Sequence, residues 1–173
     1  MTVLLTGGSA NGKSTFAEGL ASRLPDPVVY LATMIPYGPD AYSRIGRHQA
    51  QRAGRGFVTI EKYTGLAGVT LPGQATVLLE CLCNLTANEM FETGGAGPDT
   101  VQTVVRDVME IAGRAANLIV VTNDTGSDGS EYAPEVLAYI EALGQINRQL
   151  AHRFDCVCEL CCGIPLVVKG TLP

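Results

Sequence analysis

The sequence lacks several features that would assign it to whole classes of protein. Its 173 residues contain no apolar run of the roughly 20 residues that a membrane-spanning helix needs. Residues 1–6 carry no charged leader, and their apolar run is too short for a secretion signal. There is no basic excess, because 17 Asp and Glu outnumber 12 Lys and Arg and give a net charge of -5. We therefore expect a cytoplasmic protein with no membrane span and no general affinity for nucleic acid.

The sequence also has no internal repeat, linker or low-complexity segment that would divide it. Its length fits one domain of about 100–200 residues, and a hydrophobic content of 46% is enough for a core. Apolar strands alternate with helical patterns, which is typical of a parallel sheet built from β-α-β units. We expect residues 1–173 to form one doubly wound α/β domain with a mostly parallel sheet flanked by helices. The expected strands cover 3–6, 28–32, 76–81, 117–122 and 156–161, and the expected helices cover 13–24, 40–55, 98–116 and 134–153.

Six cysteines raise the question of a metal site. Four of them fall in the run Cys156-Val-Cys-Glu-Leu-Cys-Cys, and thiolates are good zinc ligands. The spacing does not give a pair of C-x-x-C knuckles, and the run lies in a strand-like apolar stretch. Free cysteine behaves as a small hydrophobe in protein cores, so we favour a structural role over a metal site. A cytoplasmic location would keep these thiols reduced.

A phosphate-binding loop follows the first expected strand. The residues Gly7, Gly8, Ser9, Ala10, Asn11, Gly12, Lys13 and Ser14 fit the pattern G-x-x-x-x-G-K-[ST]. Its glycines let the backbone turn tightly, so that successive N–H groups and the following helix N-terminus face phosphate oxygens. Lys13 would reach the β- and γ-phosphates, and the Ser14 hydroxyl would hold Mg²⁺. The motif lies between an expected strand and an expected helix, which predicts a P-loop NTPase-type domain.

An acidic residue at the end of the third expected strand is a candidate metal ligand. P-loop enzymes need a carboxylate at the carboxyl end of a strand to hold Mg²⁺ or its water shell. Glu80 occupies such a position, and we favour this role over that of an ordinary acid at a strand end.

A basic segment carries the other candidate for chemistry. Residues 41–60 contain no Asp or Glu. Helical spacing would place six of their side chains on one face: Arg44, Arg47, His48, Gln51, Arg52 and Arg55. Such a face suits a triphosphate, whose charge would offset the mutual repulsion of the arginines. Neighbouring positive charges favour a neutral imidazole, which could attack an α-phosphorus and expel pyrophosphate. The alternative is a solvated basic face with an incidental histidine. The second histidine, His152, is expected at the surface.

Several segments in order resemble the bifunctional adenosylcobinamide kinase/guanylyltransferase family. They are TGGSANGKSTFAE, VVYLAT, RIGRHQAQR, TIE, LLECL, VVTND and the tail GQINRQLAHRFDCVCELCCGIPLVVKG. The resemblance spans nearly the whole chain and implies a trimeric α/β P-loop enzyme that uses GTP, ATP and Mg²⁺. It implies that His48 is guanylylated, that Gly7 to Ser14 cradle phosphates, and that Glu80 serves the metal. It further implies that the nucleotide is flanked by Ala32, Thr33 and Met34, with Arg52 and Glu61 near the GMP.

The implied chemistry has two steps. The terminal hydroxyl of adenosylcobinamide first takes a γ-phosphoryl group from ATP or GTP. The new phosphate then attacks the GMP carried by His48, which gives adenosylcobinamide-GDP. Two alternatives from the residues alone are a P-loop small-molecule kinase without nucleotidyl transfer and a non-catalytic GTP-binding module. A histidine on a basic face beside an intact P-loop favours the bifunctional enzyme.

The sequence also departs from the family pattern in one region. The glutamate expected after V-V-x-N is Asp124, which is a candidate catalytic base by position. The glycine-rich stretch that follows is lengthened over residues 126–134, and the next segment, 136–143, lacks the usual basic residues. The glutamine of an N-Q pair is Arg148. These changes fall in what the resemblance implies is the corrinoid-facing or kinase half, and they leave the basic segment intact.

Overall fold

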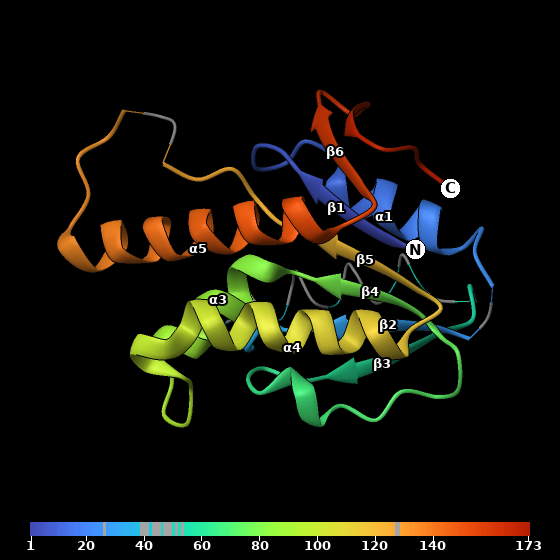
Figure 1. Ribbon diagram of the computed structural model, residues 1–173, viewed down its shortest axis with the longest axis horizontal. Helices are drawn as coiled ribbons and strands as arrows, with labels where there is room; N and C mark the ends of the chain where they lie inside the picture. The colour runs from blue at the N-terminus through green and yellow to red at the C-terminus, as the bar shows by residue number, and fades with distance from the viewer. Residues whose placement is uncertain are drawn as a thin grey trace.

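A seven-stranded sheet forms the centre of the computed structural model, which describes residues 1–25, 27–38, 42, 46, 50, 52, 54–126 and 129–173 (Figure 1). The strand order is β3-β2-β4-β5-β1-β6-β7. All neighbours pair in parallel except β6 and β7, which are antiparallel. The strands are β1 Thr2–Thr6, β2 Val28–Ala32, β3 Phe57–Glu61, β4 Thr76–Glu80, β5 Asn117–Val121, β6 Cys156–Cys161 and β7 Ile164–Lys169.

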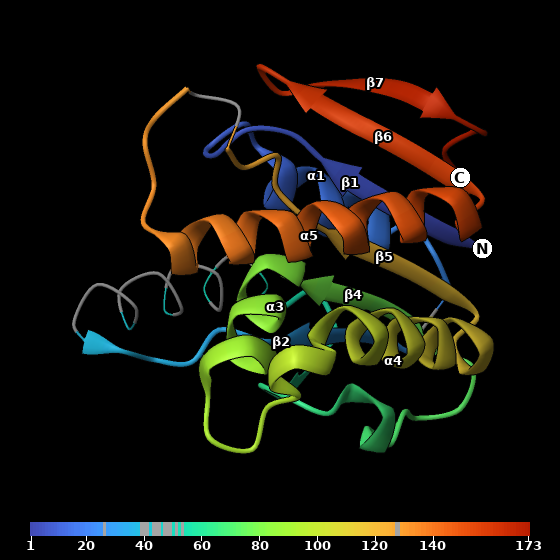
Figure 2. The ribbon, with the colours of Figure 1, turned by 60° about the vertical axis from the view of Figure 1, so that its left-hand side comes forward.

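Helices cover both faces of this sheet, which is why its central strands are apolar on both sides. The helices are α1 Lys13–Ala21, α3 Leu82–Phe91, α4 Thr100–Arg114 and α5 Pro134–Arg153, with short 3-10 helices η1 Leu66–Gly68 and η2 Gly97–Asp99. In Figure 2, α3, α4 and α5 lie on one face and α1 lies on the other. Two buried clusters correspond to these faces: Leu20 of α1 packs in one, and Leu85, Val108 and Leu150 pack in the other. The expected α/β class, with a mostly parallel sheet flanked by helices, is confirmed.

Most of the expected elements match the structure. The strand at Val28–Ala32, the helix at Pro134–Arg153 and the strand at Cys156–Cys161 have the expected bounds. The first helix ends at Ala21, three residues before the expected end. The helix expected at 98–116 is instead a 3-10 turn followed by α4, which ends at Arg114.

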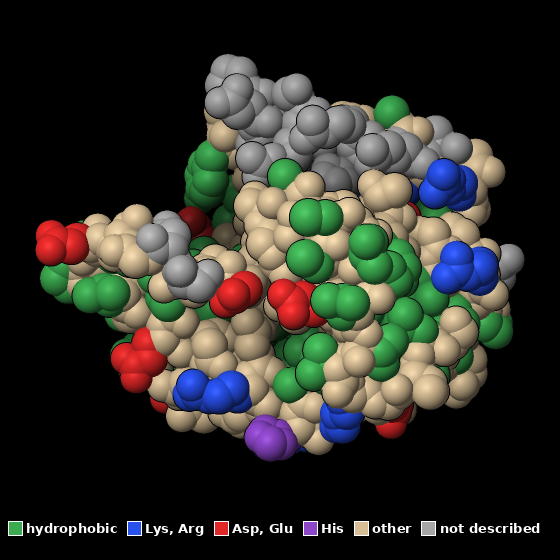
Figure 3. All heavy atoms as spheres, turned by 90° about the horizontal axis from the view of Figure 1, so that it is seen from above, with side chains coloured by type: hydrophobic (Ala, Val, Ile, Leu, Met, Phe, Trp, Pro, Cys, Tyr) green, Lys and Arg blue, Asp and Glu red, His purple; other side chains and the backbone are tan. Residues whose placement is uncertain are grey.

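Three elements were not expected from the sequence pattern. Strands β3 and β7 lie at the two edges of the sheet, and their side chains are largely exposed although both segments are rich in apolar residues. Helix α3 was not expected either. The expected core strand Cys156–Cys161 is present, and the exposed strand β7 follows it and pairs with it. Figure 3 shows hydrophobic side chains at the surface of the side of the molecule where β6 and β7 lie.

Part of the expected helix at 40–55 lies outside the described residues. Its described positions Tyr42, Gly46, Ala50 and Arg52 are helical. Arg55 is not on this helix: it lies in a turn between Gly54 and Gly56, both with φ of 75°, a left-handed conformation that glycine tolerates. The sequence prediction that Arg55 extends the basic helical face was wrong for this reason.

The cysteines divide into buried and exposed groups. Cys83, Cys156 and Cys158 are in the buried clusters, whereas Cys161 and Cys162 are exposed around the turn between β6 and β7. All six are free thiols. Among the helices of the described residues, none combines the length and apolar character needed to cross a membrane.

Candidate nucleotide site

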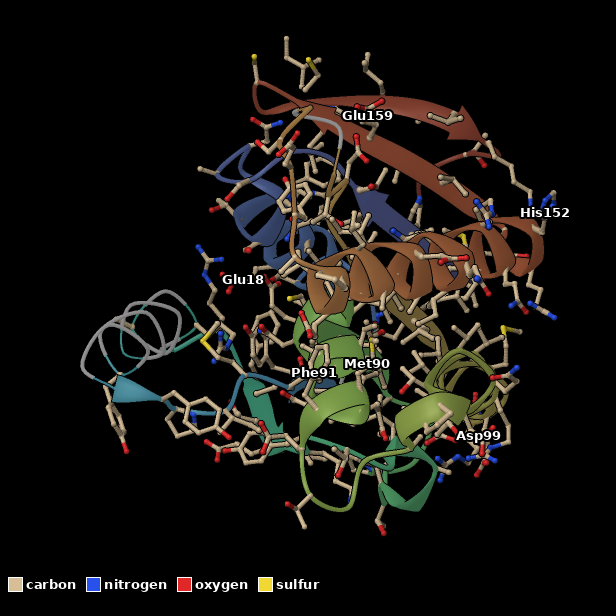
Figure 4. All side chains as sticks on the ribbon, turned by 90° about the vertical axis from the view of Figure 1, so that its left-hand side faces the viewer. Glu18, Met90, Phe91, Asp99, His152 and Glu159 are labelled. Carbon is tan, nitrogen blue, oxygen red and sulfur yellow. The ribbon has the colours of Figure 1, made fainter. Side chains whose placement is uncertain are left out.

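A cavity of about 560 Å³ opens at the carboxyl edge of the sheet, where ligands bind in open α/β folds. Its walls come from the loop between β1 and α1 and from the ends of strands β2 to β5 (Figure 4). Eleven of the residues singled out in the sequence line it: Ser9, Ala10, Asn11, Gly12, Lys13, Ser14, Ala32, Met34, Arg52, Glu61 and Glu80. Gly7 and Gly8 lie in the same loop. The structure therefore gathers residues from distant parts of the chain around one hollow.

The backbone of the loop depends on glycine at two positions. Gly7 has φ of 133°, and a Cβ there would lie 2.5 Å from the carbonyl oxygen of Leu160 in β6. Gly12 has φ of 83° and is the N-cap of α1. Because α1 begins at Lys13, its N-terminal N–H groups and the positive end of its dipole face the cavity. This is the geometry of an anion site.

Lys13 places its ammonium group inside the loop. Its Nζ donates hydrogen bonds to the carbonyl oxygens of Gly7, at 2.9 Å, and of Gly8, at 2.6 Å. Burial disfavours the charged form and lowers the pKa of Lys13 below its ordinary value, while the Glu80 carboxylate acts in the opposite direction. The side chain is thus held at the position where phosphate oxygens would replace its carbonyl partners.

Ser14 and Glu80 meet across the cavity floor. The Ser14 hydroxyl, in the first turn of α1, donates a hydrogen bond to the Glu80 carboxylate at the end of β4. The two residues are 66 positions apart in the sequence. A hydroxyl and a carboxylate beside a phosphate loop are the hard oxygen ligands that Mg²⁺ accepts, so this pair fits a metal site.

Thr33, also expected beside the nucleotide, is buried beneath the cavity and does not line it. Its hydroxyl donates to the Cys81 carbonyl at 2.8 Å, and its N–H donates to the Glu80 carbonyl at 3.1 Å. Its own carbonyl accepts from the Asn88 amide at 2.8 Å. Thr33 therefore holds the segments that follow β2 and β4 together below the site.

Arg52 enters the site from the basic segment and is almost fully buried. Its Nη1 lies 3.5 Å from the Glu18 carboxylate of α1, and its Cζ lies 3.3 Å from the ring centroid of Tyr30 in β2. Arg52 and Glu18 are 6% and 1% exposed. A guanidinium stacked on an aromatic ring and paired with a buried acid is firmly fixed. Burial raises the pKa of Tyr30, which keeps its hydroxyl protonated.

Of the expected basic face, the structure describes Arg52 and Arg55. Arg44, Arg47, His48 and Gln51 lie outside the described residues. Glu61, at the end of β3, lines the cavity and accepts a hydrogen bond of 2.9 Å from the Tyr63 hydroxyl. His152 is exposed near the end of α5, far from the site, as the sequence predicted (Figure 4).

The cavity also contains residues that the sequence did not single out as part of a site: Thr15, Tyr30, Thr59, Cys81, Cys83, Asn84, Val121 and Asn123. Cys81 and Cys83 form a hydrogen-bonded thiol pair, which lowers the pKa of Cys83 to about 6 and raises that of Cys81. Their position directly after β4 could have identified them, since polar groups that follow adjacent parallel strands meet at one edge. Asp124, the candidate base, is exposed, and its N–H donates to the Gly7 carbonyl at 3.3 Å.

Comparison with known proteins assigns the chain to a family. The model of the CobU family, cobinamide kinase / cobinamide phosphate guanyltransferase, matches residues 3–168. The bifunctional adenosylcobalamin biosynthesis protein CobP of Pseudomonas aeruginosa is 28% identical over 98% of both chains. The corresponding CobU proteins of Escherichia coli and Salmonella typhimurium are 26% and 27% identical, over 98% of this chain and all of theirs.

A solved structure supports the fold alone. The Pyrococcus horikoshii protein of Project ID PH0250 superimposes with a TM-score of 0.56 at 15% identity, covering 98% of this chain and 86% of that one. The family match, in contrast, confirms the resemblance read from the sequence and with it the class of enzyme. The chain belongs to the cobinamide kinase / cobinamide phosphate guanyltransferase family.

Proposed function

We propose that this chain phosphorylates adenosylcobinamide and then transfers GMP to the product through a guanylylated histidine. The observation that carries the proposal is the cavity, in which a phosphate loop, an acid at a strand end and a buried arginine converge. Family membership supports the identity of the acceptor, because its relatives are bifunctional adenosylcobalamin biosynthesis proteins.

In this proposal, each part of the cavity has a defined role. The backbone of Gly7 to Ser14 and the Lys13 ammonium bind the β- and γ-phosphates of GTP or ATP. Ser14 and Glu80 hold Mg²⁺, which when bound neutralises charge on the phosphates. Ala32, Thr33 and Met34 flank the nucleotide, with Thr33 acting from below, and Arg52 and Glu61 lie near the GMP.

The first reaction is a phosphoryl transfer. The acceptor's hydroxyl oxygen attacks the γ-phosphorus and gives its proton to a base, for which Asp124 is the candidate by position. The bond to the β-phosphate oxygen breaks, and the nucleoside diphosphate leaves with that electron pair. Positioning and charge neutralisation account for most of the acceleration in such reactions. Lys13 and the N-terminus of α1 would provide both, because the loop between β1 and α1 holds them at the same anion site.

The second reaction passes through His48. A neutral imidazole nitrogen attacks the α-phosphorus of GTP and pyrophosphate leaves, which gives a phosphoramidate. A phosphate oxygen of the phosphorylated acceptor then attacks the same phosphorus and releases the histidine. The product is adenosylcobinamide-GDP, and the two displacements together regenerate the enzyme.

We also propose that the chain works in the cytoplasm as a homotrimer. Six free thiols suit a reducing compartment. Strand β7 offers a surface for association, since Ile164, Leu166, Val167 and Val168 are exposed on an edge strand. A monomer in solution at micromolar concentration would contradict the trimer without affecting the chemistry.

The transferase half is tested with GTP labelled at its α-phosphate. The wild-type protein should retain a label that survives alkali and is lost in acid, as a phosphoramidate is. His48→Asn should retain none. His152→Asn is the matched control, because it removes the only other histidine and should be labelled like the wild type. An unlabelled wild type, or a labelled His48→Asn, contradicts the proposal for this half.

The kinase half is tested separately with γ-labelled ATP or GTP and adenosylcobinamide. Label should pass to the corrinoid in wild type and in His48→Asn alike. Failure of transfer in the wild type would contradict the kinase half. Transfer without histidine labelling would reduce the protein to a P-loop small-molecule kinase.

A further inference from the structure

A second hollow lies between α3 and the N-terminal part of α5. It has a volume of about 300 Å³ and is lined by Ala87, Phe91, Glu135, Val136 and Tyr139. Its rim exposes large apolar side chains: Phe91 is 57% exposed, Val136 40%, and the neighbouring Leu137 52%. We call these residues the helix-pair hollow. Apolar side chains gathered at one surface hollow favour a binding site over an ordinary solvated face.

The helix-pair hollow adjoins the nucleotide cavity. The Tyr139 hydroxyl donates a hydrogen bond of 3.3 Å to the carbonyl oxygen of Cys83, and Cys83 lines the cavity. Tyr139, which lines the hollow, thus contacts a residue of the cavity wall. Figure 4 looks onto the carboxyl edge of the sheet, and Phe91 at the end of α3 lies on this side of the molecule, beneath α5. A ligand in the hollow could therefore extend a flexible arm toward the phosphate loop.

The helical segments that line the hollow carry acids but no basic residue. Residues 82–105 and 115–147, which include both helical segments of the hollow, contain no Lys or Arg. On α5 these stretches carry two exposed acids, Glu135 and Glu141, whereas Glu89 of α3 is buried. Glu135 lines the hollow itself. Such a surface repels nucleotides and suits an apolar ligand that carries positive charge.

Adenosylcobinamide has these properties. Its cobalt(III) is opposed by one negative charge from the corrin ring and one from the adenosyl carbon, which leaves a single positive charge. Its macrocycle is largely apolar, and its peripheral side chains are neutral amides apart from the one that ends in the reacting hydroxyl. The hydroxyl lies on a flexible arm, so the ring and the reacting atom can occupy neighbouring sites.

We infer that the helix-pair hollow receives an edge of the corrinoid ring while the hydroxyl arm passes Tyr139 into the nucleotide cavity. This inference rests on the proposed function, since it assigns a surface to that function's acceptor. Burial of Phe91 and Val136 against the ring provides affinity, and Glu135 selects for positive charge.

The test replaces a hollow residue with a cation and compares it with an equivalent change elsewhere. Val136→Lys should raise KM for adenosylcobinamide by about tenfold or more, because it loses apolar contact and adds like charge. GMP labelling and KM for ATP should not change. Val58→Lys is the matched control, since Val58 is 47% exposed on β3, outside both hollows. Phe91→Ala, which removes an exposed side chain and should fold normally, should also raise KM for the corrinoid.

Equilibrium dialysis followed by the visible absorbance of adenosylcobinamide should show the same loss of affinity, independently of turnover. The inference is overturned if Val136→Lys and Phe91→Ala bind the corrinoid as Val58→Lys does. It is also overturned if they change the oligomeric state on size exclusion instead, because the hollow would then be a subunit contact. A wild-type protein that binds the corrinoid but does not phosphorylate it would refute the kinase half alone. A wild-type protein that neither binds nor phosphorylates the corrinoid would refute both the kinase half and this inference.

Discussion

Removing the buried charge of Glu18 should destabilise the protein strongly. Glu18 and Arg52 are almost fully buried, and their charged atoms are 3.5 Å apart. In Glu18→Gln the Arg52 guanidinium stays buried over Tyr30 but loses an anionic partner. Burying a charge without compensation is one of the few single changes that cost several kcal/mol.

The size of this effect can be worked from the geometry. At 3.5 Å and an effective dielectric constant of about 20, the Coulomb attraction is about 5 kcal/mol. Breaking a buried pair typically costs about 3–5 kcal/mol, and this pair is longer than an ideal hydrogen bond. We expect about 3 kcal/mol. At about 2–4 °C per kcal/mol for a chain of this size, Tm should fall by roughly 6–12 °C.

The assay is urea and thermal unfolding, with a second Glu→Gln variant as the control. Glu110 pairs with Arg114 at 3.8 Å on the exposed side of α4, with the two side chains 47% and 38% exposed. Such a surface pair contributes about 0.5 kcal/mol or less, so Glu110→Gln should unfold close to wild type. If Glu18→Gln cost less than about 1 kcal/mol, or no more than the control, the reasoning from buried charge would be refuted.

Three further predictions concern the cavity. Gly7→Ala should lower the unfolding free energy by about 2 kcal/mol or more, since its Cβ would clash with the Leu160 carbonyl at a strained φ; a thermal melt like wild type would contradict this. Glu80→Gln should raise the Mg²⁺ concentration for half-maximal activity by roughly 10–100-fold, and an unchanged magnesium titration would exclude Glu80 from the metal site. Alkylation of Cys83 by iodoacetamide should fall as pH drops through about 6, because its thiolate forms at that pH, and nucleotide should slow it. A rate that still rises between about pH 7 and 9 would indicate an ordinary thiol.

The charged groups of the cavity interact strongly because they share a partly buried space. Its floor combines the N-terminus of α1, the Lys13 ammonium and the Glu80 carboxylate in a partly buried space, where charges interact more strongly than in water. A triphosphate would bring negative charge to the loop, and a divalent cation would bring positive charge to Ser14 and Glu80. The site therefore suits a triphosphate and a divalent cation together better than either one alone.

Local patterns in the sequence determined much of this protein. The phosphate loop could be read from eight adjacent residues, because its backbone geometry depends on glycines and a helix start that are neighbours in the chain. The bounds of β2, α5 and β6 were also predicted, since buried strands are continuously apolar and α5 has a clear proline start. The family was recognised from short motifs in order.

Only the tertiary structure decided which distant residues meet. The strand order brings Glu80 to Ser14, because parallel strands connected by crossovers align their carboxyl ends at one edge. The packing of α1 likewise brings Glu18 within 3.5 Å of Arg52. Thr33 is turned under the cavity by hydrogen bonds to residues about 50 positions away. The edge strands β3 and β7 were not predicted, because whether an apolar segment pairs at the edge of a sheet depends on the strand beside it and not on its own residues.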